Sequence, residues 1–122
     1  MATITNKPGQ LNFEFRKNAD YRKTMKWELV DVNGNKVPVD MTGFLIAIKV
    51  YDSHLPSRNL LDTLNQSSGN VYNIDPTNGK FDLFFPKAKL SSWNKDRLFY
   101  ELEITQSNND IKILTDGYIK II

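Results

Sequence analysis

The segment "VDMTGFLIAIKVYDS", residues 39–53, decides the fold class of this chain. Its apolar residues recur at every second position, namely Phe44, Ile46, Ile48 and Val50. This spacing places them on one face of an extended strand, whereas a helix would spread them around its axis. The opposite face is apolar at its start and polar toward its end, which is typical of a strand covered on both sides at one end. The segment therefore predicts a central β-strand.

The same period of two occurs in six other segments. They span residues 10–16, 23–31, 79–86, 98–104, 110–114 and 117–122. In the second of them, Met25, Trp27 and Leu29 are expected to point into the core. The dipeptide Asn33-Gly34 that follows is a strong signal for a tight hairpin turn. The chain therefore reads as a series of strands joined by short turns.

One segment between the strands has helical character, because Pro86 is expected to open a short helical turn at residues 87–93. Many short strands without a long helix indicate a single all-β domain, an antiparallel β-sandwich of about seven strands. We assign residues 1–9 to an N-terminal arm and residues 10–122 to the β-sandwich. The segment 53–70 is too long for a hairpin and is interpreted either as a contact loop or as a disordered one.

Composition excludes several classes of function. The chain has 122 residues, no cysteine and a formal net charge of +2. Disulfide bonds, thiolate metal sites and thiol catalysis are therefore excluded. The even charge balance does not indicate nucleic-acid binding, and a solvated strand face is the simpler explanation of the basic segment 16–26. No export signal and no apolar run long enough for a membrane span occur, so we expect synthesis in a cytoplasm and no membrane partner.

Candidate catalytic groups are few. His54 is the single histidine, and no serine lies in a G-x-S-x-G motif, so spacing supports no catalytic triad. Glu101 and Glu103 share one side of a strand and could form an acid–base pair, but an exposed charged face explains them better. The turn that starts at Asp31 resembles a calcium loop and lacks its later ligands. We therefore expect no catalysis, no cofactor and no metal ion.

Aromatic rings are the remaining candidates for a binding surface. Exposed rings would suit a sugar-binding or an oligonucleotide-binding face, although packing in a core or interface is their commoner use. Phe84 and Phe99 stand out because each lies on the face opposite the main apolar set of its strand. Exposure of both rings would mark a contact with another protein.

Three stretches of the sequence resemble a known family of proteins. They are "WELVDVNGNKVPVDMTGFLIAIKVYD", "GKFDLFFPKAKLSSW" and "FYELEITQSNNDIKILTDGYIKI", in this order along the chain. Together they resemble the small immunoglobulin-like virion proteins of tailed bacteriophages, over about residues 24 to 122. The positions that match the motifs of this family are Val39, Asp40, Thr42, Gly43, Phe44, Tyr100, Glu101, Leu102 and Gly117.

This resemblance implies an immunoglobulin-like β-sandwich and a non-catalytic structural or adaptor role on the head, neck, tail or baseplate of a virion. The implied partners are other virion proteins and copies of the chain itself, with no small-molecule substrate and no nucleic acid. The implied location is the virion, after synthesis in the host cytoplasm. A carbohydrate-binding β-sandwich module is the alternative. The residues expected at a protein interface are Lys49, Tyr51, His54, Leu55, Phe84 and Phe99.

Overall fold

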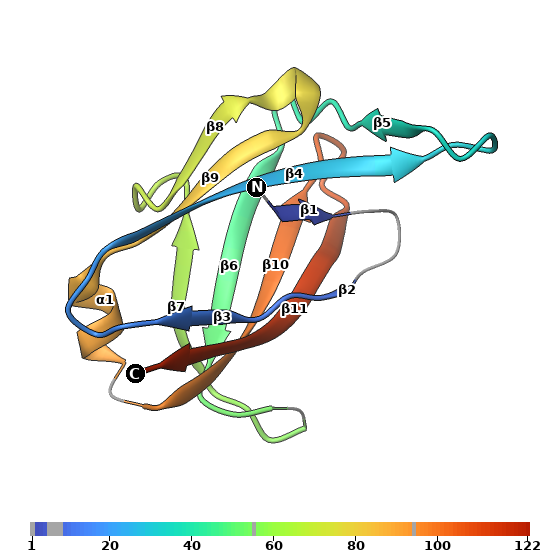
Figure 1. Cartoon of the computed structure of the whole chain (residues 1–122). Coiled ribbons are helices and arrows are strands. Elements are labelled where there is room, and N and C mark those ends of the chain that lie inside the picture. The colour runs from blue at the N-terminus through green and yellow to red at the C-terminus, as the bar shows by residue number, and fades with distance from the viewer. Residues whose placement is uncertain (1, 5–8, 55, 94) are drawn as a thin grey trace.

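The computed structural model describes residues 2–4, 9–54, 56–93 and 95–122 (Figure 1). These residues form eleven strands, one 3-10 turn and one short α-helix. The all-β fold class predicted from the alternating segments is therefore confirmed. The predicted interface residue Leu55 lies outside the described residues.

The strands make two sheets. The five-stranded sheet has the order β1 (Ala2–Ile4), β4 (Tyr21–Val30), β9 (Lys80–Phe85) and β8 (Val71–Asp75), with β5 (Lys36–Pro38) paired to the far part of β4. The six-stranded sheet has the order β2 (Gly9–Gln10), β11 (Ile111–Ile121), β10 (Arg97–Thr105), β6 (Leu45–Tyr51) and β7 (Leu60–Asn65), with β3 (Phe13–Phe15) also paired to β11.

The segment that decided the fold class forms β6, which lies between β10 and β7. Ile46, Ile48 and Val50 are fully buried, so the prediction of a central strand is confirmed. The alternation of buried and partly exposed residues in β6 and β10 has the period of two that the sequence indicates. The segment 53–70, interpreted from the sequence as a contact loop or a disordered loop, contains the strand β7 at residues 60–65.

Two features of the predicted architecture differ from the structure. The prediction had about seven strands, all antiparallel, whereas β1 runs parallel to β4, and β2 and β3 run parallel to β11. Residues 2–4 and 9, predicted as part of an N-terminal arm, thus pair with the sheets. Strands of two or three residues are too short to show a hydrophobic period, and side-chain alternation fixes which face is buried but not which strand lies alongside.

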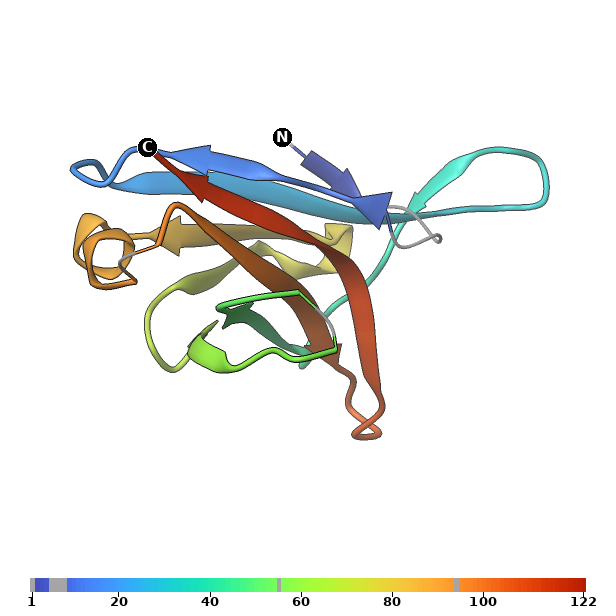
Figure 2. The ribbon, with the colours of Figure 1, turned by 90° about the horizontal axis from the view of Figure 1, so that it is seen from below.

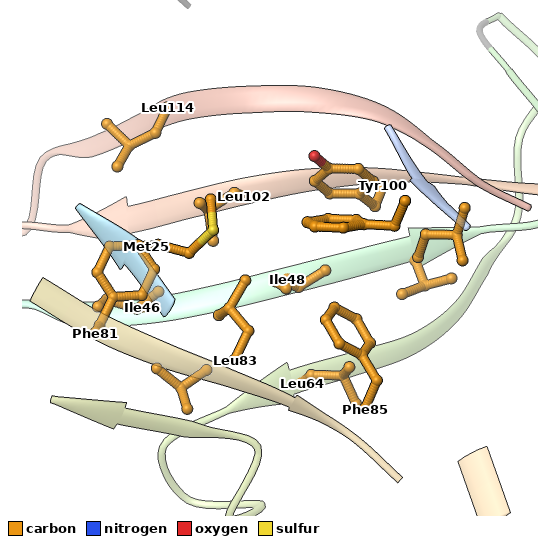
Figure 3. Close-up of a cluster of buried hydrophobic side chains, with 14 of the residues drawn as sticks. Met25, Ile46, Ile48, Leu64, Phe81, Leu83, Phe85, Tyr100, Leu102 and Leu114 are labelled. Atoms are coloured by element: carbon orange, nitrogen blue, oxygen red, sulfur yellow. The ribbon is translucent and has the colours of Figure 1, made fainter. Parts of the chain in front are cut away.

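The core lies between the two sheets. Figure 3 shows side chains from both sheets packed together, with β4 and β9 on one side and β6 and β10 on the other. Burying one such large apolar side chain contributes about 1.5–3 kcal/mol, so this cluster is the main source of stability in a chain without disulfides. Its labelled members are Met25, Ile46, Ile48, Leu64, Phe81, Leu83, Phe85, Tyr100, Leu102 and Leu114.

The predicted helical turn is confirmed as α1 (Lys87–Ser92), which begins after Pro86. Leu90 is buried, and Trp93 donates its indole N–H to Asp62 Oδ2 on β7 at 3.1 Å. Lys89 Nζ lies 2.9 Å from the same oxygen. The carboxylate of Asp62, which points inward from the edge strand β7, is therefore paired with Lys89 and hydrogen-bonded to Trp93. A charge in this position also discourages a strand of another chain from adding to β7. No helix in the described part of the chain has the length and apolar character that a membrane span needs.

The segment that joins β2 to β3 is tied by side chains to β10 and β11 of the same sheet. The hydroxyl of Tyr100 donates to the carbonyl of Leu11, and Asn12 Oδ1 accepts the backbone N–H of Tyr118 at 3.0 Å. Gly117 leaves the space for this segment, because a Cβ there would lie 2.3 Å from the Leu11 carbonyl oxygen. These contacts hold β3 against the edge of β11.

A two-stranded arm extends beyond the body of the molecule at the end of β4 (Figures 1 and 2). This β4–β5 arm spans residues 28–38. Leu29 was predicted to point inward, but 42% of it is exposed because the opposing sheet does not reach this far. Asp31 Oδ1 accepts the N–H groups of Asn33 and Asn35, both at 2.9 Å, and so fixes the turn. The arm therefore presents apolar side chains from an ordered turn, namely Leu29, Val30, Val32 and Val37.

Candidate functional site

The predicted interface residues of β6 and β10 meet on the outer face of the six-stranded sheet. Tyr51 on β6 and Tyr118 on β11 both lie opposite Phe99 on β10, so three rings form a row across three strands. The ring of His54 packs edge-on against Phe99, with centroids 5.1 Å apart. The guanidinium of Arg58 lies 3.8 Å from the centroid of the Tyr51 ring. Aromatic and Arg side chains in contact are a common composition for the centre of a protein interface.

Charged side chains occupy the middle of the same face. Lys49 Nζ lies 3.1 Å from Glu103 Oε1, and the Arg58 guanidinium lies 3.0 Å from Glu101 Oε1. The two glutamates considered as an acid–base pair are thus each paired with a cation. Ion pairs this exposed contribute about 0.2–1 kcal/mol each, so their main effect is to balance the charge of the face.

The far end of this face is aliphatic. Leu45 and Ile111 lie on either side of Thr105, and each is 62% exposed. In the next row, Ala47 and Ile113 lie on either side of Glu103. The outer face thus passes from aliphatic to charged to aromatic along the strands, and we call it the β6–β10–β11 face. Such a mixed surface suits contact with a protein more than contact with a small molecule.

A small cavity at this face has no room for an organic ligand. It has a volume of about 30 Å³ and lies among His54, Arg58, Phe99 and Asp116. This space is about that of a single water molecule, whereas pockets for small ligands are about ten times larger or more. The cluster around His54 therefore offers no substrate site.

Phe84 lies on the other sheet, away from the remaining predicted residues. It is partly exposed on the outer face of β9, and the guanidinium of Arg22 lies 5.2 Å from its ring centroid. The same guanidinium lies 5.0 Å from the Tyr72 ring on β8 and 3.7 Å from Asp82. Phe84 and Phe99 therefore belong to two separate surfaces and do not form one contact.

The described residues contain no group of three or more His, Asp or Glu side chains placed to hold a metal ion. Trp27 is buried between the sheets and Trp93 beneath α1, so neither indole ring offers a surface on which a sugar could stack. Burial raises the pKa of Tyr100, whose hydroxyl faces the N-terminal segment and not solvent.

Two residues of these surfaces, Tyr118 and Arg58, were missed by reasoning from the sequence. Tyr118 follows the same outward alternation as Phe99 and could have been found from the pattern of the last strand. Arg58 lies in the loop before β7, where no period indicates its direction. Leu29 of the β4–β5 arm was instead taken for a core residue, because the pattern of β4 does not show where the opposing sheet ends.

Asp52 holds the loop that carries His54 and Arg58 through hydrogen bonds to Asn59. Asp52 accepts the backbone N–H of Asn59 at 2.8 Å and its side-chain amide at 3.1 Å, and these hydrogen bonds lower the pKa of Asp52 below its ordinary value of 3.8. A carboxyl group with a lowered folded-state pKa stabilises the fold fully above its unfolded pKa, and this effect is lost as pH falls through the folded value.

We therefore expect Asp52→Ala to lower the free energy of unfolding near neutral pH, and we expect the difference from the unsubstituted chain to shrink below about pH 4. Urea unfolding of both chains over a series of pH values measures this difference. A difference that stays constant down to the lowest pH would show that the carboxylate charge does not hold the loop.

Comparison of the chain with models of known protein families gives no match, and comparison with curated proteins gives none either.

Proposed function

We propose that this chain is a non-catalytic structural or adaptor protein of a bacteriophage virion, which docks other virion proteins and copies of itself. Its place would be the head, neck, tail or baseplate, and it would act through the shape and chemistry of its surfaces. The resemblance of residues 24–122 to small immunoglobulin-like virion proteins is the sequence argument. The fold and the exposed surfaces add physical arguments.

The order of the strands supports an immunoglobulin-like β-sandwich. In that fold one sheet has the order A, B, E, D and the other contains C, F and G, with an added strand beside C in some types. Matching the strands in chain order gives β1, β4, β9, β8 for the first sheet and β11, β10, β6, β7 for the second. The short helix between β9 and β10 lies where such domains cross from one sheet to the other. We infer the immunoglobulin-like identity from this order.

The single observation that carries the proposal is the β4–β5 arm. It extends beyond the body of the molecule (Figure 2). It presents four apolar side chains, and Val32 at its turn is fully exposed. Turns at a free surface normally carry polar residues, and apolar side chains there favour burial against another protein. In a symmetric assembly, such a projecting element would fix one subunit against the next.

Mass spectrometry of density-purified particles from a lysate of the source tests the proposal. We expect the chain to be present in a fixed ratio to the capsid protein, as a rotationally symmetric position in the particle requires. Val32→Asp should remove the chain from particles, whereas Asn33→Asp, which adds the same charge at the next turn position, should leave it in place. Absence of the unsubstituted chain from purified particles would contradict the proposal.

A carbohydrate-binding module is the second candidate, and one observation favours it. Tyr72 and Phe84 are partly exposed on the outer face of the five-stranded sheet, with Arg22 between their rings. Rings of this kind can stack on sugars. A titration with oligosaccharides, followed by NMR at the amides of these residues, would distinguish this function. Quenching of tryptophan fluorescence would be a poor readout, because both tryptophans are buried.

A further inference from the structure

A groove separates β3 from the first half of β4. The two strands leave the loop of residues 16–20 at the left of Figure 1 and diverge, because β3 belongs to one sheet and β4 to the other. The groove has a volume of about 510 Å³ and is lined by residues 11–13 on one wall and residues 22–25 on the other. This volume lies within the range of about 300–1,000 Å³ that is usual for ligand-binding sites.

The wall formed by β4 is a free strand edge. β4 pairs with β9 along residues 21–26 and with β5 along residues 28–30, while on its other side β1 covers only residues 25–27 (Figure 1). Within the described part of the chain, residues 21–24 therefore have a strand neighbour on one side only. Backbone groups alternate between the two sides of a strand, so part of this stretch directs N–H and C=O groups toward the groove.

The groove is also basic. Its lining includes Arg22 and Lys23 and no acidic residue. Arg22 is engaged by Asp82 and by the rings of Tyr72 and Phe84, whereas Lys23 forms no ion pair with another described residue. Lys23 is exposed. Because successive side chains of a strand point to opposite faces, Lys23 lies on the same face of β4 as Met25, and Arg22 lies on the other face. The basic segment singled out in the sequence thus contributes an unpaired cation beside a free strand edge.

We propose that this groove binds an extended acidic segment of another protein, which adds to the free edge of β4 in line with β1. Four residues of such a segment would cover residues 21–24, over about 13 Å at the usual rise of a strand. Main-chain hydrogen bonds to β4 supply affinity, and an acidic side chain next to Lys23 supplies preference. The parallel pairing of β1 with residues 25–27 demonstrates that this edge accepts a strand.

The geometry favours a polypeptide over a nucleic acid. A single-stranded nucleic acid is usually held by several cations along its backbone and by exposed rings on which bases stack. The groove offers one unpaired lysine, and its lining ring, Phe13, is buried in the core. This inference goes beyond the virion role and does not depend on it, because any acidic extended segment would satisfy it.

The test uses isotope-labelled protein and capped peptides of about eight residues in which Glu alternates with Val, as β-strand addition requires. NMR titration should shift the amide signals of residues 11–13 and 21–24. A matched Lys–Val peptide and a Glu–Val peptide with N-methylated backbone amides should each bind much more weakly. Lys23→Glu should weaken binding of the Glu–Val peptide by about tenfold. Lys112→Glu makes the same change at an exposed position of β11 and should leave the binding unchanged.

Several results would overturn the inference. Equal binding of the N-methylated peptide would exclude strand pairing, and tighter binding of a deoxythymidine oligonucleotide than of the Glu–Val peptide would make the groove a nucleic-acid site. Signal shifts confined to other surfaces, or no binding of the Glu–Val peptide at millimolar concentration, would also refute it. Each result is independent of whether the chain is found in purified particles, so failure of one proposal is distinguishable from failure of the other.

Discussion

Gly79→Ala is expected to destabilise the fold by roughly 2–5 kcal/mol, because two separate costs act at this residue. Gly79 has φ +70°, in the left-handed region that side chains disfavour. A Cβ there would also lie 2.4 Å from the carbonyl oxygen of Trp27 and 3.0 Å from that of Val39. The Trp27 carbonyl cannot easily move away, since it accepts the N–H of Val39 at 3.0 Å. The clash therefore falls on backbone atoms of β4, at Trp27, and of the segment between β5 and β6, at Val39.

Gly34→Ala is the matched control for this substitution. Gly34 has a similar φ of +82°, but a Cβ there would meet nothing within 4 Å. It should cost only the conformational penalty of about 1 kcal/mol. Urea unfolding of the two variants separates the clash from the backbone penalty. Equal losses for both variants would show that the strands around Gly79 relax to make room.

The sequence predicted the part of the fold that depends on strict alternation. In β6, β9 and β10, the inward positions found by a period of two are the buried ones, including Ile48, Leu83 and Leu102. The pattern works there because both ends of each strand are covered by the opposite sheet. It fails at Leu29, since the hydrophobic period continues along β4 after the opposite sheet has ended.

The pairing of the N-terminal strands could not be predicted. β1, β2 and β3 have two or three residues each, and their parallel neighbours are distant in sequence. Their placement depends on particular contacts, such as the hydrogen bond of Tyr100 to Leu11 and the room left by Gly117. No composition or period signals such contacts. The groove between β3 and β4 is formed by this pairing, so it could not be predicted from the sequence either.

The surfaces were predicted in part, for the same reason. Tyr51 and Phe99 were singled out by alternation, and the structure places them opposite each other on adjacent strands. His54 joins them by packing on Phe99. Phe84 was selected by the same rule, but the rule does not tell which sheet a strand belongs to. Reasoning from one strand finds outward residues, whereas grouping them into a surface requires the topology.

Phe85→Ala is expected to lower the free energy of unfolding by about 3–5 kcal/mol, the usual cost of removing a buried phenylalanine ring. Phe85 is fully buried at the end of β9 (Figure 3). Its ring centroid lies 4.8 Å from that of Phe15 and 5.6 Å from that of Phe13. The ring therefore joins the five-stranded sheet to β3 at the edge of the other sheet. Its loss leaves a cavity that rigid strands on both sides cannot close.

Phe84→Ala provides the matched comparison, since it removes the same ring from the adjacent residue on the opposite face. Phe84 packs on Arg22 at the surface, so its loss should cost about 1 kcal/mol or less. Urea unfolding measures both values under one condition. Similar losses would contradict the assignment of Phe85 to the core and Phe84 to the outer face. A large loss for Phe85 alone, combined with a fully folded Phe84→Ala chain, makes the latter suitable for testing whether the Phe84 surface contacts a partner or a sugar.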